Sequence, residues 1–212
     1  VADSLASARP DSAIALLNTL KESMKAESEA TRMYYRLLCI KANDKAYIRH
    51  TSDSLILPVL HYYTEKKDEH HLPEAYYYAG RVYRDLEDAP LALDLSLILD
   101  YFQKAIDALP DNKGYRLKSK IYSQMGTLFL YQKTYDEALK ILKEARKCNI
   151  ALKDSASMVF NLRDIANGYR CLDQNDSSLY YLRKAYYIAK VLRNYDLMAM
   201  VQSQMASLYI EL

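Results

Sequence analysis

Glycine and proline are scarce in this sequence. Its 212 residues include 4 Gly and 5 Pro, whereas average usage gives about 15 and about 10 in a chain of this length. Because these residues interrupt regular structure, their scarcity favours long helices joined by short turns. Trp is absent and Phe occurs 3 times, against 21 Tyr, so most of the aromatic volume carries a hydroxyl group that needs water or a partner. We therefore expect tyrosines to line many half-buried helix contacts.

The sequence also lacks an excess of charge of one sign. Its 29 basic and 27 acidic residues are interspersed and give a net charge of +2, which predicts no contact with nucleic acid. No apolar run approaches the ~20 residues of a membrane span, so we expect no membrane insertion. The three cysteines, Cys39, Cys148 and Cys171, are far apart. This spacing supports neither a disulfide framework nor a zinc site and favours ordinary packing residues.

Motifs of the common enzyme classes are missing as well. The sequence contains no His-Glu-x-x-His, no Gly-rich phosphate loop and no Gly-x-Ser-x-Gly elbow. Of its four histidines, His50, His61, His70 and His71, the adjacent last two cannot share a helix face as metal-binding pairs do. We interpret all four as solvated loop residues. We expect no catalytic residue, no metal site and no cofactor.

Helical periodicity is present from the start of the chain. One helix can begin after Pro10, capped by Asp11 or Ser12, a second near Glu27, and a third after Ser52. Apolar residues follow each start at the i, i+3, i+4, i+7 spacing of a helix with one buried face. Residues 11–71 are therefore expected to form helix pairs.

From about residue 72 the sequence repeats itself. Gly126, Ala166 and Ala206 recur with a period of roughly 40 residues, which lies in the range of repeat arrays. Gly126 and Ala166 are each followed, after the same interval, by another small residue, Ala138 and Ser178. Small residues at fixed spacing allow neighbouring helices to approach closely. The spacing predicts helix-pair units at 72–114, 115–152 and 153–193, followed by an unpaired helix at 194–212.

These motifs resemble the tetratricopeptide repeat (TPR) family. An apolar–small pair followed by an aromatic residue, such as Met125-Gly126 and Phe129, matches its first helix. The resemblance covers residues 72–212 with good motifs and 11–71 with degenerate ones, and the period exceeds the family's usual value of about 34. It implies that the whole chain is a single all-α domain, a right-handed superhelical solenoid of antiparallel helix pairs.

One unit departs from the pattern inside the apolar run 91–99. The six additional residues there turn a helix by about 600°, so its two halves cannot present the same face. We expect a bend or an exposed apolar helix in this run.

The resemblance also implies a binding surface, because solenoids of this kind bind partners on the face formed by the first helix of each pair. If Ala79 and Gly80 face the core, Tyr77 is the best exposed aromatic candidate. Arginine forks bind carboxylates in bidentate fashion, so we expect a protein or peptide partner that is acidic or ends in a free carboxylate. The candidate binding residues are Arg32, Tyr35, Glu74, Tyr77, Arg81, Arg84, Lys120, Gln124, Arg163, Asn167 and Arg170.

Within this set, Arg163 and Asn167 lie one helical turn apart. They resemble part of the carboxylate clamp with which some family members bind a peptide C-terminus, and Gln204 falls near the next clamp position. The third element of such a clamp would lie past the end of the chain.

Residues 9–13, 52–55 and 75–83 resemble a bacterial subgroup of these repeats, whose members are exported lipoproteins or the sensor-like front ends of membrane regulators. Together with a start at Val1 rather than Met, this implies a processed piece with an extracytoplasmic location, periplasmic or lipid-anchored after signal removal. A cytoplasmic location is the alternative.

The function we expect is that of a non-catalytic scaffold that binds a protein or peptide. Two alternatives stay open. The first is a sensor or regulatory domain of a larger membrane-associated signalling or transcription-regulatory protein, whose regulatory region would lie beyond Leu212. The second is a self-assembly module, in which the run 91–99 or the final helix packs against another copy to form a homo-oligomer.

Overall fold

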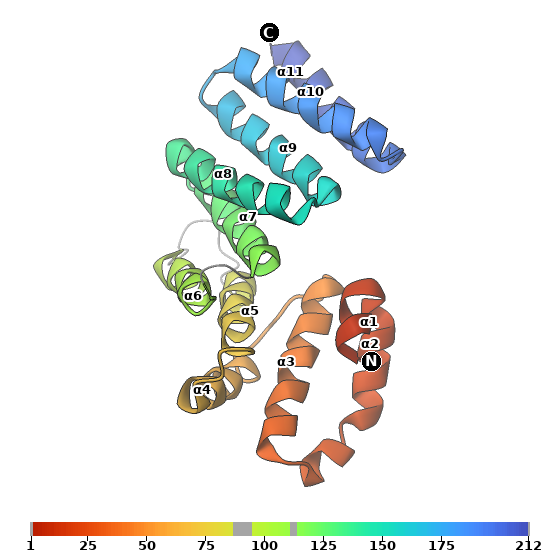
Figure 1. Ribbon diagram of the computed structural model, residues 1–212, viewed down its shortest axis with the longest axis vertical. Coiled ribbons are helices and arrows are strands. Elements are labelled where there is room, and N and C mark those ends of the chain that lie inside the picture. Colours follow the sequence, from red (N-terminus) through yellow and green to blue (C-terminus); the bar gives the residue numbers. More distant parts are fainter. Residues whose placement is uncertain (1, 87–94, 111–113, 212) are drawn as a thin grey trace. The chain divides into compact units, whose positions relative to one another are not determined.

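The computed structural model describes residues 2–86, 95–110 and 114–211 (Figure 1). These residues form helices with short connections, and no strand occurs among them. The chain divides into two compact units, Val1–Asp111 (unit 1) and Asn112–Leu212 (unit 2). In each unit, helices that follow one another in sequence pack against each other, which confirms the prediction of an all-α array of helix pairs.

The described part of unit 1 consists of six α-helices and one 3₁₀-helix. They are α1 (Ala2–Ala8), α2 (Pro10–Leu20), η1 (Ser23–Ala26), α3 (Glu29–Lys45), α4 (Ile56–Lys66), α5 (Leu72–Leu86) and α6 (Leu95–Asp107).

The first three α-helices of unit 1 share one core. Ala13 and Leu17 of α2 and Leu38 of α3 are buried in it. The sequence reasoning missed α1, whose short run offers one buried residue, Ala6. It also misjudged the start of α2, where Pro10 takes the first turn and no side chain caps the helix. Proline suits this place because it has no N–H group that a cap would have to satisfy.

The remaining helices of unit 1 pack around α5, which contacts α3, α4 and α6. Gly80 allows α5 and α6 to approach closely, because a Cβ atom there would lie 2.6 Å from Cε1 of the buried Phe102 on α6. The predicted bend in the run 91–99 falls largely outside the described residues. Its described part, residues 95–99, starts α6.

Unit 2 contains five described helices of 17 or 18 residues. They are α7 (Tyr115–Tyr131), α8 (Tyr135–Leu152), α9 (Ser155–Cys171), α10 (Asn175–Val191) and α11 (Tyr195–Glu211).

The turns of unit 2 explain both the repeat period and the scarcity of glycine. Lys133, Lys153, Asp173 and Arg193, at equal intervals along the chain, all adopt positive φ angles between 53° and 62°. One residue after each, a backbone N–H donates to the carbonyl five positions earlier, as in Asp154 N to Asn149 O at 3.0 Å. This is the Schellman geometry, which usually takes glycine. Each helix with its turn spans half of the period, so one helix pair makes one repeat.

Gly126 lies where two helices cross closely, as predicted, whereas Ala206 at the equivalent repeat position is exposed. A Cβ atom on Gly126 of α7 would lie 2.5 Å from Cγ of Leu142 on α8. The final helix, α11, buries Val201 and Leu208 in the core that it shares with α9 and α10, while Ile210 is 85% exposed. The division of the chain into these repeat units within a single domain stays a prediction.

Candidate functional site

Four of the predicted binding residues lie on α5, and the prediction that Tyr77 is exposed is wrong. Its exposed fraction is 3%, and its ring lies 5.9 Å from the ring of Phe102. The reason is that α5 packs against α6 on one side and against α3 and α4 on the other, so the middle of this helix has no open face. Burial raises the pKa of Tyr77 to about 12.

The charged residues of α5 are bound within unit 1. Nε of Arg81 donates to Oδ1 of Asp44 at 2.6 Å, and the two side chains are 13% and 2% exposed. Glu74 accepts from Nζ of Lys41 at 2.7 Å, and Lys41 also pairs with Asp3 at 2.7 Å. Arg81 and Glu74, which were predicted to bind a partner, therefore hold α5 to α3. The charge pattern of the sequence alone does not reveal these ion pairs.

Arg84 belongs to a charged pocket of about 250 Å³ that Arg81, Arg49 and Asp85 also line. Burial lowers the pKa of Arg84, and the neighbouring Arg81 lowers it further. Arg49 donates to the backbone oxygen of Asp85 at 2.6 and 2.8 Å. Arg81 pairs with Asp44, and the carboxylates of Asp44 and Asp85 add negative charge to the lining, so this pocket is a poor candidate for binding an acidic partner.

The interpretation of the histidines as solvated loop residues is wrong for two of the four. His50 is 8% exposed, and its Nδ1 lies 2.7 Å from Oδ2 of Asp85. His71 is half-buried and stacks on Tyr63 with ring centroids 5.0 Å apart. Both sit in connections that pack back onto helices. His61 and His70 are exposed, as predicted, but His61 lies on α4 and not in a loop.

The contact between His50 and Asp85 predicts an acid-dependent stability of unit 1. Burial alone would raise the pKa of Asp85, but the hydrogen bonds from the side chain and backbone of His50 outweigh it and lower the pKa. A carboxyl group whose pKa is lower in the folded state stabilises the fold at pH values above its unfolded pKa of about 3.9. This stabilisation is lost as the pH falls through the folded-state pKa.

We therefore expect Asp85→Asn to reduce the free energy of unfolding most at neutral pH and least near pH 3. Urea unfolding at both pH values measures this, with the exposed Asp11→Asn as the control. If the difference in the free energy of unfolding between wild type and Asp85→Asn does not change with pH, the Asp85 carboxylate does not stabilise unit 1 through its contact with His50.

The predicted residues of α3 also serve the fold. Arg32 donates to the backbone oxygen of Glu27 at 3.2 Å. The hydroxyl group of Tyr35 donates to the backbone oxygen of Leu17 at 3.0 Å and joins α3 to α2. In unit 2, Lys120 and Gln124 are half-buried on α7.

Arg163, the predicted clamp arginine, is held by its neighbours on α9 and α11. Its Nε and Nη2 atoms donate to Oδ1 of Asp164 at 2.9 and 2.7 Å, and Nη1 donates to Sδ of Met200 at 3.2 Å. Its guanidinium also lies 5.4 Å from the ring centroid of Phe160. Burial raises the pKa of Asp164, and Arg163 opposes this shift only in part. Arg163 therefore does not join Asn167 in one pocket.

The structure instead brings Asn167 together with Arg170. These two residues of α9 line a pocket of about 190 Å³ with Ser178 of α10 and with Gln204 and Ser207 of α11, over Ala166 and Leu182. Nη2 of Arg170 donates to Oδ1 of Asn167 at 3.1 Å, which leaves the NH₂ group of Asn167 as a donor. No Asp or Glu is among the described residues that line it.

This pocket, which we call the α9–α11 pocket, can accept an anionic group chemically. A guanidinium, two amide groups and two hydroxyl groups converge on it, and all five can donate hydrogen bonds. Sequence reasoning named Asn167, Arg170 and Gln204 but missed Ser178 and Ser207 as site residues. Ser207 stands one full repeat period after Asn167, so the repeat spacing could have found it.

The described residues contain neither a metal-binding group nor a membrane-spanning helix. No group of three or more His, Cys, Asp or Glu residues in this part of the chain is placed to hold a metal ion. None of the described helices is long and apolar enough to span a bilayer.

Comparison with known proteins identifies the fold. No family model matches the sequence, and no curated protein sequence matches it. Among solved structures, the chain is similar to a signal transduction ATPase with numerous domains (STAND protein) with a tetratricopeptide repeat sensor, from Pyrococcus horikoshii. The TM-score is 0.76 at 15% identity, and the match covers 95% of this chain but 30% of that one. The likeness shows a TPR-like fold.

Proposed function

We propose that this chain is a non-catalytic scaffold that binds a protein or peptide partner through the α9–α11 pocket. The group received there is a carboxylate, either the free C-terminus of the partner or an acidic side chain. Arg170 supplies the charge, and Asn167 and Gln204 supply amide donors.

The observation that carries this proposal is the composition of the pocket wall. Arg170, Asn167 and Gln204 come from two different helices and line one cavity, and no acidic residue is among the described residues that line it. A carboxylate has two oxygens that accept several hydrogen bonds, and hydrogen bonds to charged groups are about twice as strong as neutral ones. The TPR-like fold supports the same proposal, since repeat arrays of this kind present extended surfaces for partners.

The proposal predicts a difference between two forms of the same ligand. In a library of labelled heptapeptides, binding measured by fluorescence anisotropy should weaken about tenfold or more, a loss of about 1.4 kcal/mol, when the free C-terminus is replaced by an amide. Arg170→Ala and Asn167→Ala should weaken binding of the free acid by a similar factor and leave the amide unaffected.

Arg116→Ala serves as the matched control, because Arg116 is an exposed arginine on α7 outside the pocket. It should bind both forms like the wild type. Equal binding of acid and amide, or an equal loss in Arg116→Ala, would refute a carboxylate site in this pocket. A pull-down from the source lysate with wild type and Arg170→Ala then identifies the natural partner.

The similarity to a TPR sensor in a STAND protein favours a second candidate function. In that case the chain is the sensor part of a larger signalling protein, and the peptide that it binds is the signal. This candidate predicts that the reading frame continues past Leu212 into a membrane helix or an effector domain. An extracytoplasmic location, inferred from the sequence resemblance, would fit this role, and fractionation of the source cells tests it.

A further inference from the structure

Unit 2 contains a second cavity, which we call the α8–α10 groove. It has a volume of about 430 Å³ and lies between α8 and α10, with α9 contributing to its floor. It shares no lining residue with the α9–α11 pocket. Its volume is within the range of about 300–1,000 Å³ that is usual for ligand sites.

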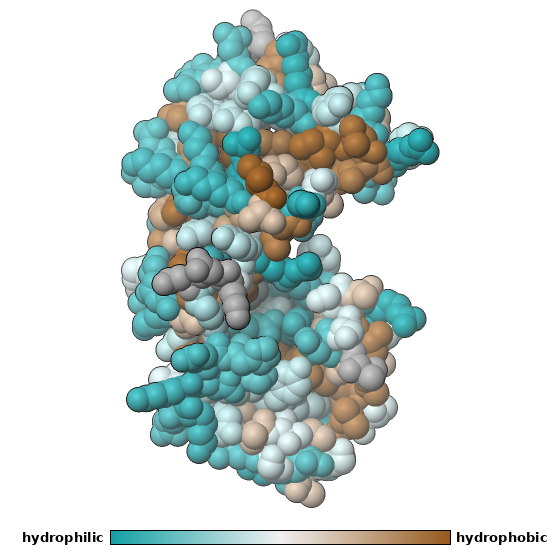
Figure 2. Space-filling model, in the orientation of Figure 1, coloured by the Kyte–Doolittle hydropathy of each residue, from teal (hydrophilic) through white to brown (hydrophobic). Residues whose placement is uncertain are grey.

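The floor of the groove is apolar and its walls are aromatic. Met158 and Leu162 of α9 and Ile188 of α10 line it and belong to the hydrophobic core around α9 and α10 or pack against it. Tyr180 and Tyr187, two turns apart on α10, also line it, yet they are 53% and 68% exposed. Figure 2 shows hydrophobic surface gathered over the part of the molecule that α9 and α10 form. Large aromatic side chains beside an open apolar floor are typical of interaction sites.

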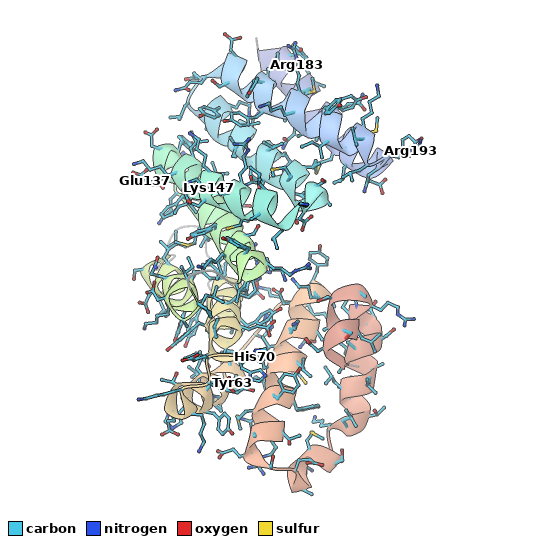
Figure 3. The ribbon with its side chains drawn as sticks, in the orientation of Figure 1. Tyr63, His70, Glu137, Lys147, Arg183 and Arg193 are labelled. Carbon is cyan, nitrogen blue, oxygen red and sulfur yellow. The ribbon has the colours of Figure 1, made fainter. Side chains whose placement is uncertain are left out.

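The rim of the groove is positively charged. Arg146 comes from α8, and Arg183 and Lys184 come from α10; Figure 3 labels Arg183. Nζ of Lys184 lies 4.2 Å from the ring centroid of Tyr180. Neither arginine has a carboxylate within salt-bridge distance among the described residues, whereas the nearby Lys147 pairs with Glu144 at 2.6 Å. No Asp or Glu among the described residues lines the groove.

We propose that the α8–α10 groove binds an acidic, amphipathic peptide segment of a protein partner. One or two large apolar side chains of the segment lie on the floor between Tyr180 and Tyr187. Carboxylates on either side of this anchor pair with Arg146 on α8 and with Arg183 and Lys184 on α10. Charge complementarity selects this occupant, because three cations from two helices border one apolar floor, with no acidic residue among the described residues that line it.

This inference goes beyond the proposed function, since it assigns a second binding surface to the same unit. The α9–α11 pocket recognises a single carboxylate through amide and guanidinium donors. The α8–α10 groove recognises a hydrophobic anchor within an acidic sequence. The two surfaces are tested with different peptides and different variants.

The experiment uses the full chain and labelled decapeptides in which one Leu, Phe or Trp lies between glutamates, all amidated at the C-terminus. We expect the acidic peptides to bind in fluorescence anisotropy titrations. Binding should weaken about tenfold or more in Arg146→Glu/Arg183→Glu. It should also weaken when the anchor is replaced by Gly, and when salt is raised from about 0.05 M to about 0.5 M, because salt screens exposed charges.

Lys140→Glu/Lys190→Glu is the matched control, because it makes the same charge change at exposed positions of the same two helices outside the groove. This control should bind like the wild type, and Arg170→Ala should also leave this binding unchanged. Tyr187→Ala, which removes an exposed wall without disturbing the core, should weaken binding.

Three results would overturn the proposal. One is the absence of binding to any acidic peptide, and another is an equal loss of affinity in the control variant. The third is sedimentation of the wild type as a dimer that Tyr187→Ala converts to a monomer, since the groove would then be occupied by a second copy of this chain.

Discussion

Arg81→Ala is expected to destabilise unit 1 by about 3–5 kcal/mol, the effect of leaving a buried charge without its partner. Asp44 has a side chain that is 2% exposed, and Arg81 donates to it at 2.6 Å. The loss should fall near the lower end of the range, because Nζ of Lys45 stays 3.3 Å from Oδ2 of Asp44. Hydrogen exchange of α3 and α5 peptides in the intact chain, measured across a urea series, gives the change, with unit 2 peptides as internal reference.

Two further variants separate loss of the pair from loss of packing. Lys45→Ala removes the more exposed partner of the same carboxylate and should cost less than about 1 kcal/mol. Arg81→Leu/Asp44→Leu replaces both charges by apolar groups and should be milder than Arg81→Ala, since buried pairs often contribute little net stability. A double variant as unstable as Arg81→Ala would contradict the ion-pair explanation. Substitution of Arg81 therefore tests folding and does not report on partner binding.

Gly126→Ala is the second substitution with a large expected effect. Alanine improves helix propensity by about 1 kcal/mol over glycine, so an open site would gain stability. Here the new Cβ atom would lie 2.5 Å from both Cγ and Cδ2 of Leu142, whose side chain is fully buried. Overpacking of this kind costs about 1–3 kcal/mol or more, and we expect a net loss of stability in unit 2 by urea unfolding.

A double-mutant cycle tests whether this clash is the cause. Leu142→Ala alone should cost about 2–5 kcal/mol through the cavity that it leaves. In Gly126→Ala/Leu142→Ala the added methyl group has room, so the two changes should be less destabilising together than the sum of the single effects. Strict additivity would mean that the two sites do not touch, contrary to the packing of α7 on α8.

The repeat architecture could be predicted from the sequence because its cause is local and periodic. Gly126 and Ala166 stand where two helices of a pair cross, and the same crossing recurs in each repeat. The turn residues themselves, such as Lys133 and Asp173, gave no signal, since their positive φ angles are normally taken by glycine. The hydrogen bonds of the turn impose that conformation on side chains with no preference for it.

The surface of α5 could not be predicted, because its environment depends on helices distant in sequence. Periodicity identified one buried face, but α5 is covered on two sides, so Tyr77 is buried and Arg81 is bound to Asp44. His50 is buried for a related reason, since its connection folds back onto Asp85. Even Cys171 departs from the expectation of a packing residue, as it is exposed, whereas Cys148 is buried.

The candidate site was predicted in part. Asn167 and Arg170 face one pocket together with Gln204, as the repeat register suggested for the first-helix face. The sequence also predicts Arg163, one turn away from Asn167, as a clamp residue, because helical spacing does not reveal an adjacent acid that takes its hydrogen bonds. The guanidinium of Arg163 donates to Asp164 and Met200 instead of facing the pocket that Asn167 lines.

The most direct test of carboxylate binding by the α9–α11 pocket is an NMR titration of isotope-labelled chain with a heptapeptide from the anisotropy screen. The side-chain amide signals of Asn167 and Gln204 and the guanidinium signal of Arg170 should shift with the free-acid peptide and stay in place with its C-terminal amide. Identical shifts with both peptides, or shifts confined to other parts of the chain, would contradict the account.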